Sequence, residues 1–162
     1  MNPPTRFADI PDLLAGLLRF PADRPALTFY QGRTRAGRLA YGELLAAVDR
    51  FTVRLREQLR LAAGDRLAIL SPNRLEVPPL LLAAMRLGVV VVPLNPTTNP
   101  ADWDYILGHS GARMIFVHTD LEHLLGDSSL PRVVIDDTDR SDSPYARFVS
   151  DAPIPYCTAV SK

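Results

Sequence analysis

The segment from residue 66 to residue 92 constrains the fold most, because two short apolar runs flank an apolar helical segment. Residues 66–70 suit a buried strand, and the β-branched run VVVV at 89–92 predicts a second one. Between them, LLLAAMRL is apolar on nearly every side, and Gly88 can take the left-handed conformation that closes a helix. This order predicts a βαβ unit with a right-handed crossover, whose helix is covered on two sides.

Both ends of the central helix carry local signals. Asn73 and Glu76 have the spacing of a capping box. Pro78 and Pro79 lack amide hydrogens, so the helix either begins at them or is kinked there.

The segment PLNPTTNP follows the second strand. Pro93 and Pro96 are expected to end that strand, because proline cannot continue a central ladder. Asn99 is then expected to cap a helix that Pro100 begins. The positions of this helix that are expected to face inward are Trp103, Ile106 and Leu107.

The N-terminal part predicts a short helix, a hairpin and a long helix. Apolar spacing from Ile10 to Leu18 favours a helix that Asp9 or Asp12 could cap. Residues 26–30 and 37–40 read as two strands, with Gly32 and Gly37 at the turn. From Tyr41 the apolar stripe of the long helix consists of Leu44, Val48, Phe51, Leu55 and Leu59.

Two further strands are expected at residues 113–117 and 133–135. The alternation of strands and helices predicts an α/β fold: a mostly parallel, doubly wound sheet with helices on both faces, plus a small N-terminal β-hairpin. Ligands of such sheets usually lie beyond the carboxyl ends of the strands, and PLNPTTNP is expected at that edge.

Composition excludes several classes of partner. The formal net charge is zero and the pI is near 6.8, which gives no reason to expect binding to nucleic acid or to an anionic membrane. The longest apolar stretch, residues 77–85, is too short to span a bilayer. A single cysteine and the lack of zinc-ligand spacing favour a reducing compartment, so we expect the cytoplasm.

We assign no catalytic, cofactor-binding or metal-binding residue. His109 is interpreted as a surface residue near a helix end, where an imidazolium could meet the helix dipole. His118 is expected to end a strand and His123 to lie in a short helix. No serine or cysteine nucleophile is expected near either residue, so neither is assigned a role. Asn95 and Asn99 lie at the expected ligand edge, but turn formation and capping explain both without a ligand.

The C-terminal part gives no firmer candidate. Cys157 has no histidine or arginine beside it that argues for a lowered thiol pKa. Three acidic residues lie close together in the sequence at Asp136, Asp137 and Asp139. A solvated turn explains this acidic group better than a metal site does. No Gly-x-Gly-x-x-Gly or Walker loop follows any expected strand, which disfavours an independent nucleotide-binding fold.

Three segments in order resemble the start of the AMP-forming adenylating enzymes, the superfamily of acyl-CoA synthetases, luciferases and nonribosomal adenylation domains. They are LAYGELLAAVDRFTVRL at 39–55, AGDRLAILSPN at 63–73, and MRLGVVVVPLNPTTNPADWDYILGHSGARMIFV at 85–117. The resemblance covers roughly residues 24–136. The PLNP sequence favours the acyl-CoA synthetases within the superfamily.

The resemblance implies ATP, Mg and CoA as cofactors of a full-length relative, with none bound by this chain. In the family, the Ser/Thr/Gly-rich phosphate loop, a Tyr-Gly-x-Thr-Glu motif, a ribose-binding aspartate and a C-terminal lysine come later in the chain. The tail PYCTAVSK lies where the phosphate loop would begin, but it has no glycine to let successive amides approach a phosphate.

We therefore expect residues 1–140 to form the N-terminal α/β subdomain of a ligase and residues 141–162 a Ser/Asp/Pro-rich tail. The first hypothesis is a truncated, AMP-forming acyl-CoA synthetase that is inactive alone and whose partner is the remainder of the ligase. The alternative is a stand-alone module without catalysis, which binds a second copy or another partner through an exposed apolar face.

Overall fold

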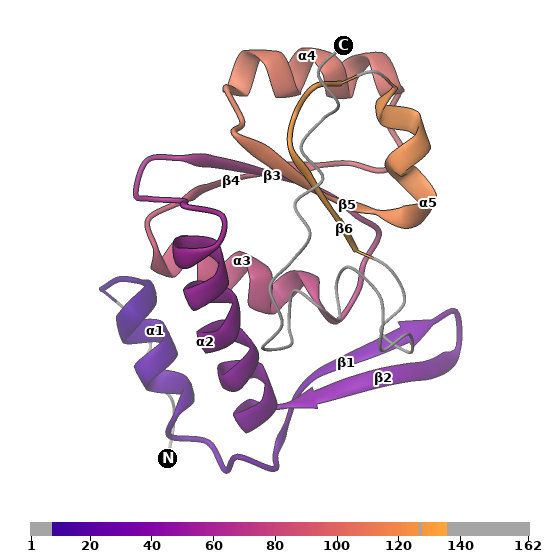
Figure 1. Cartoon of the computed structure of the whole chain (residues 1–162). Helices are drawn as coiled ribbons and strands as arrows, with labels where there is room; N and C mark the ends of the chain where they lie inside the picture. The colour runs from indigo at the N-terminus through magenta and orange to yellow at the C-terminus, as the bar shows by residue number, and fades with distance from the viewer. Residues whose placement is uncertain (1–7, 127, 136–162) are drawn as a thin grey trace.

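The computed structural model describes residues 8–126 and 128–135, which form a parallel four-stranded sheet, a separate two-stranded hairpin and the helices around them (Figure 1). The elements in chain order are α1 (Ile10–Leu17), β1 (Pro25–Gln31), β2 (Thr34–Ala40), α2 (Tyr41–Glu57), β3 (Arg66–Leu70), α3 (Val77–Arg86), β4 (Val90–Leu94), α4 (Pro100–Ser110), β5 (Met114–His118), α5 (Thr119–Glu122), the 3-10 helix η1 (His123–Leu125) and β6 (Arg132–Ile135).

The sheet has the order β4-β3-β5-β6, and all three pairs of neighbours are parallel. Alternate residues of β3 enter two different hydrophobic cores. Leu67 and Ile69 belong to the core that α2 and α3 cover, whereas Ala68 and Leu70 belong to the core that contains Trp103 of α4. The central strand is thus buried on both faces, as its continuous apolar sequence predicts.

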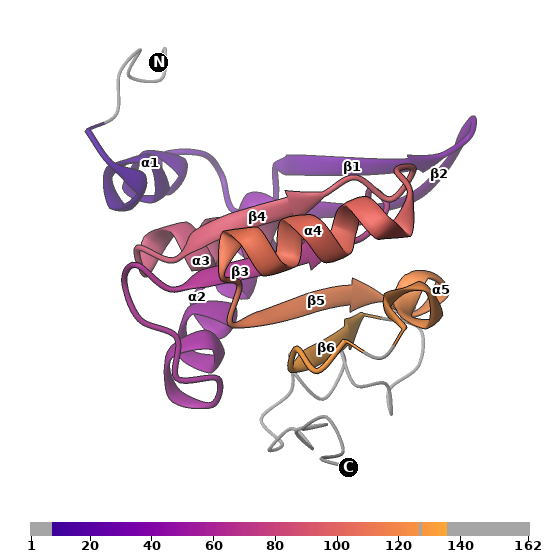
Figure 2. The ribbon, with the colours of Figure 1, turned by 90° about the horizontal axis from the view of Figure 1, so that it is seen from above.

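The helices lie on the faces that right-handed crossovers require. In Figure 1, α2 and α3 lie below the sheet and α4 and α5 lie above it. The chain moves from β3 to β4 through α3 and then back across β3 to β5 through α4, so the reversal of direction places α4 on the opposite face (Figure 2). The predicted doubly wound α/β fold with an N-terminal hairpin is confirmed.

The predicted capping box at Asn73 and Glu76 is wrong, because α3 begins only at Val77. Glu76 is itself the N-cap, and its side chain makes no capping hydrogen bond. The side chain of an N-cap residue usually accepts a hydrogen bond from the amide of the second or third helical residue. Here those residues are Pro78 and Pro79, and proline has no amide hydrogen to donate. Of the two expected roles of these prolines, the start of the helix is therefore the correct one.

Pro93 does not end its strand: β4 continues to Leu94, and Pro93 pairs with Ile69 of β3. The expectation of a sharp stop assumed a central strand, but β4 lies at the edge of the sheet. The amide of Val90 donates to Asp65 O at 2.8 Å. Strand alternation then turns the nitrogen of Pro93 toward the open edge, where no ladder hydrogen bond is lost.

Only one of the two glycines expected at the hairpin turn lies there. Gly32 has a positive φ of 61° and turns the chain between β1 and β2. Gly37 lies inside β2 opposite Phe29. A Cβ atom at Gly37 would lie 2.7 Å from Leu75 Cδ1, so this glycine makes room for a leucine from the β3–α3 loop.

The remaining helices follow their predicted signals. Asp9, and not Asp12, caps α1, because its carboxylate accepts from the Asp12 amide at 2.8 Å. The apolar stripe of α2 is buried, including Leu55 at 0% exposure and Leu59 just beyond the helix. Among the described residues, no helix is long and apolar enough to cross a membrane.

The amino edge of the sheet is held by one charged cluster. Arg113 donates to Asp65 Oδ2 at 2.6 Å and to Arg60 O at 3.3 Å, while the Ala62 amide donates to the same carboxylate at 2.7 Å. The Ala62 hydrogen bond, and after it Arg113, lower the pKa of Asp65. These contacts tie the starts of β3 and β5 together on the edge opposite to the usual ligand edge.

We predict that Gly37→Ala lowers the free energy of unfolding by roughly 1 kcal/mol, because crowding of Leu75 outweighs the smaller chain entropy of alanine. Gly108→Ala is the matched control, since a Cβ at Gly108 meets nothing within 4 Å, and helix propensity predicts a gain of up to about 1 kcal/mol. Urea denaturation measures both. If Gly37→Ala is as stabilising as the control, the proposed contact between Leu75 and the hairpin is wrong.

Candidate functional site

The carboxyl edge of the parallel sheet is the candidate functional site. Two neighbouring strands, β3 and β5, send the chain to opposite faces there: β3 leads to α3 below the sheet, and β5 leads to α5 above it (Figure 1). Such a switch in direction opens a crevice in which doubly wound proteins usually bind their ligands. The loops at this edge of the sheet follow β3, β4 and β5.

The loop after β4 is closed by its own hydrogen bonds. Asn95 Oδ1 accepts from the amide and the hydroxyl of Thr97 at 3.0 and 2.9 Å. The Asn95 carbonyl accepts from Trp103 Nε1 at 2.9 Å and from the Thr98 hydroxyl at 2.9 Å. The interpretation of Asn95 as a turn-forming residue is supported, since these contacts use its side-chain acceptor within the turn itself.

Helices α3 and α4 begin at this edge. Their first amides either donate to a capping residue or are replaced by proline, so they are not available to bind an anion. Asn99 caps α4, because its Oδ1 accepts from the Ala101 amide at 3.1 Å and its carbonyl from the Asp102 amide at 2.9 Å. At the start of α3, Pro78 and Pro79 have no amide hydrogen. The described helix starts therefore do not fit a triphosphate, which needs several free amides that point to one place.

Two buried polar atoms beside this edge have no hydrogen-bond partner among the described residues. One is Glu76 Oε2, in a side chain that is 9% exposed and lies 3.7 Å from Arg74 Nε. The other is Nε2 of His118, whose residue is 3% exposed at the end of β5. Sequence gave no sign of this burial, because His118 could equally have been a solvent-exposed residue beyond the strand.

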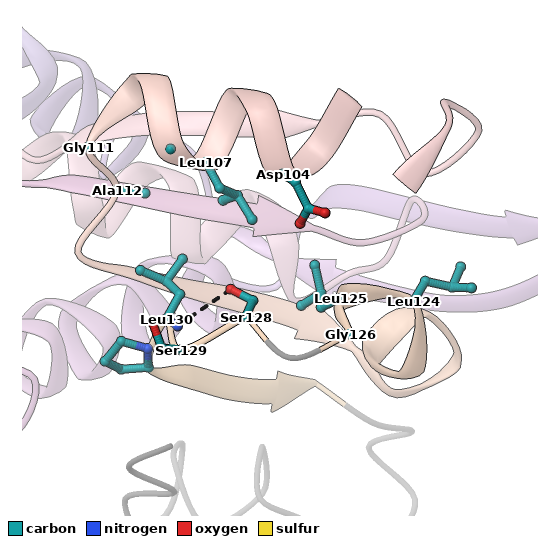
Figure 3. A pocket seen from close by; sticks show the side chains of 12 residues that line it. Asp104, Leu107, Gly111, Ala112, Leu124, Leu125, Gly126, Ser128, Ser129 and Leu130 are labelled. Carbon is teal, nitrogen blue, oxygen red and sulfur yellow. Dashed lines mark hydrogen bonds between the residues drawn. The ribbon is translucent and has the colours of Figure 1, made fainter. Parts of the chain in front are cut away.

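A separate cleft of about 840 Å³ lies between α4 and the segment that precedes β6 (Figure 3). Asp104 and Leu107 of α4 line one side, and Leu124, Ser128 and Leu130 line another. The Ser128 hydroxyl accepts from the Leu130 amide at 3.4 Å. Among the described lining residues Asp104 is the one ionisable group, so the cleft has neither a nucleophile–base pair nor a cation for a phosphate.

The other weighed residues are not brought together. His109 is exposed in the last turn of α4 and stacks on Tyr105, with ring centroids 5.5 Å apart. His123 is exposed at the start of η1. Within residues 8–126 and 128–135, no group of three or more His, Cys, Asp or Glu side chains could hold a metal ion. Cys157, the tail PYCTAVSK and the acidic group at 136–139 lie outside the described residues.

Comparison with known proteins decides the family. The AMP-binding enzyme family matches residues 16–155. The chain belongs to this family. Among curated proteins, 4-coumarate–CoA ligase-like 9 of Arabidopsis thaliana is 37% identical over 127 residues, and a long-chain-fatty-acid–CoA ligase of Escherichia coli is 30% identical over 122 residues. The predicted resemblance to AMP-forming enzymes is confirmed, and the two curated relatives named here are CoA ligases.

Solved structures agree with this assignment. A putative long-chain-fatty-acid CoA ligase of Rhodopseudomonas palustris superimposes with a TM-score of 0.73 at 25% identity, over 93% of this chain and 38% of that one. A benzoate CoA ligase of Burkholderia xenovorans gives 0.67 at 26% identity, over 95% of this chain and 30% of the other.

The chain spans only part of the length of its relatives. The alignments cover 73% and 75% of this chain, but 23% of the Arabidopsis protein and 21% of the E. coli protein.

The closed loop after β4 can be tested by changing Asn95. We predict that Asn95→Ala lowers the free energy of unfolding by about 1 kcal/mol, because the amide and the hydroxyl of Thr97 lose their acceptor. Asn95→Asp is the matched control, since a carboxylate keeps both hydrogen bonds. The single tryptophan, Trp103, donates to this loop and reports urea unfolding by its fluorescence. Equal losses in the two variants would show that the acceptor is unimportant.

Proposed function

We propose that this chain forms the N-terminal subdomain, residues 1–140, of an acyl-CoA ligase that activates a carboxylic acid with ATP and then transfers the acyl group to CoA. The family match over residues 16–155 carries this proposal. The ordered superposition on two CoA ligases over more than nine-tenths of the chain supports it. In this proposal residues 141–162 lead toward the phosphate-binding part of the ligase.

The described residues act as a scaffold in this proposal. ATP, Mg and CoA would be held by parts of a complete ligase other than the loops described here, because the loop after β4 is closed on itself and the start of α4 is capped by Asn99. Acid activation requires cationic groups near the α-phosphate, where the nucleophilic carboxylate attacks. The lining of the described cleft supplies one carboxylate, Asp104, and no cation.

The proposal includes inactivity of the chain alone. ATP–pyrophosphate exchange, tested with aliphatic, benzoate-type and cinnamate-type acids, is expected to show no turnover above a protein-free blank. The physical reason is that adenylation needs preorganised donors around a triphosphate, and the described edge uses its own donors for turns and caps.

A complete relative, the E. coli long-chain-fatty-acid–CoA ligase, assayed with a long-chain acid, serves as the positive control for this exchange assay. Robust exchange by the purified chain, lost when the chain is heat-denatured, would contradict the scaffold proposal.

A second candidate function is a stand-alone module that binds a second copy or another partner. The observation in its favour is that large apolar side chains are exposed on the sheet and on the helices that cover it, including Val53 of α2 at 43%, Met85 of α3 at 48% and Val90 of β4 at 50%. Contact with a partner would remove this surface from water. Cytoplasmic location and the absence of nucleic-acid partners remain predictions under either function.

Sedimentation velocity separates the two candidates. The scaffold proposal predicts a monomer at micromolar concentration when the rest of a ligase is missing, whereas the module predicts a dimer that Val53→Ser and Met85→Ser weaken. Gly108→Ala, which changes neither exposed side chain, controls for nonspecific effects. A tight dimer that is sensitive to these two serine variants would favour the module.

A further inference from the structure

The hairpin of β1 and β2 carries a cluster of positive charge. Residues 25–40 include three arginines and no aspartate or glutamate. All three side chains are exposed, and they belong to Arg33, Arg35 and Arg38. None of them makes an ion pair or a side-chain hydrogen bond with another described residue. The chain as a whole has no net charge, so the hairpin is a local excess that the total hides.

An irregularity in the pairing places two of these arginines on one face of the hairpin. Thr28 pairs with Arg38 and Tyr30 pairs with Arg35, so β2 has one more residue than β1 between the two pairs. Without this extra residue, positions 35 and 38 would lie on opposite faces, because side chains alternate along a strand. The opposite face packs on the β3–α3 loop at Gly37. The arginine face therefore points away from that contact.

An acidic segment of the chain begins at the carboxyl edge of the sheet. Residues 136–142, DDTDRSD, contain four aspartates and one arginine, and they lie outside the described residues. They follow Ile135, the last residue of β6. The four strands run toward the side on which the hairpin turn lies (Figure 2). The acidic segment thus leaves the sheet on the side of the hairpin.

The hairpin is within the reach of this segment. Leu70 at the end of β3 pairs with Val117 of β5, which pairs with Val134 of β6. Two strand spacings, roughly 10 Å, therefore separate the ends of β3 and β6. The loop that follows β3 contacts the hairpin through Leu75. Seven extended residues span up to about 23 Å, so the segment can cross both spacings and reach the hairpin.

Two other arginines near this edge already have acidic partners. Arg74 Nε lies 3.7 Å from Glu76 Oε2, and Arg132 Nη1 lies 3.9 Å from Glu122 Oε1. A guanidinium fits a carboxylate through paired N–H groups, and one that has no carboxylate yet gains most from a new one. The hairpin arginines are therefore the better partners for the aspartates.

We propose that the acidic segment docks on the arginine face of the hairpin in the same chain, where its aspartates pair with Arg35 and Arg38. The contact holds the chain that leaves β6 across the carboxyl edge of the sheet. Because the arginines are exposed, salt weakens the contact by screening the charges. This inference goes beyond the proposed function and does not depend on it. Pairing with the hairpin of a second copy is the alternative that the last test excludes.

A spin label in the acidic segment reports the contact. Cys157→Ser removes the single native cysteine, and Ser141→Cys attaches a nitroxide among the aspartates. We expect the label to broaden the amide signals of residues 33–38 in about 0.1 M salt, and to do so about fivefold less in about 1 M salt, where charges are screened within a few ångströms. No broadening, or equal broadening at both salt concentrations, overturns the proposal.

Two matched pairs of substitutions locate the contact. Arg35→Gln with Arg38→Gln removes two charges from the hairpin, whereas Arg50→Gln with Arg56→Gln removes two exposed charges from α2. We expect the hairpin variant to lose about four-fifths of the broadening and the α2 variant to keep most of it. Similar losses in the two variants would mean that only total charge matters, which contradicts the proposal.

A charge exchange separates pairing from damage to the hairpin. Arg35→Glu with Arg38→Glu is expected to abolish the broadening, and the further changes Asp136→Arg and Asp137→Arg to restore about half of it. If cross-strand contacts in the spectrum show an intact hairpin but the broadening does not return, the proposed pairing is wrong.

A mixture of two samples distinguishes one chain from two. The ¹⁵N-labelled wild-type chain is mixed with the spin-labelled chain that carries no ¹⁵N, and its hairpin signals are expected to stay sharp. Broadening in this mixture would assign the contact to a second copy and overturn the proposal. The proposed function stands or falls separately, by the pyrophosphate-exchange assay.

Discussion

Burial of β3 and β5 on both faces is the constraint on which the rest of the structure depends. Leu67 and Ile69 of β3 enter one core, and Ala68 and Leu70 enter the other, all with 4% exposure or less. A shift of one residue in the register would exchange these sets between cores that are built from different helices. Since neither face can meet water, helices must cover both, and that requirement dictates the crossovers through α3 and α4.

The same constraint produces the candidate site without any catalytic residue being involved. Parallel strands end at a common edge, and doubly wound proteins usually bind their ligands where the crossovers of neighbouring strands leave to opposite faces. The loop after β4 and the start of α4 differ from a phosphate-binding loop, because Asn95 and Asn99 use their side chains to close a turn and to cap a helix. Two buried atoms near this edge, Glu76 Oε2 and His118 Nε2, have no hydrogen-bond partner among the described residues.

Most of the fold could be predicted from sequence, and the errors have a common cause. Local patterns correctly predicted the strands, the positive φ at Gly88 and the cap at Asn99. Each of these features depends mainly on residues that are close together in the chain. The errors at Pro93 and Gly37 arose where the answer depends on a distant neighbour. A proline is tolerated when its strand lies at a sheet edge, and Gly37 serves a leucine from the β3–α3 loop, not a turn.

The sequence by itself determined the alternation of strands and helices, the two-faced burial of the sheet and the membership of the AMP-binding family. These properties are written in periodicity, turn residues and ordered motifs, all of which are local. Only the tertiary structure decided that β4 is an edge strand, that α3 starts at Val77, and that His118 is buried with no partner for Nε2 among the described residues. Burial and hydrogen-bond partners come from segments far apart in the chain, and no local pattern carries that information.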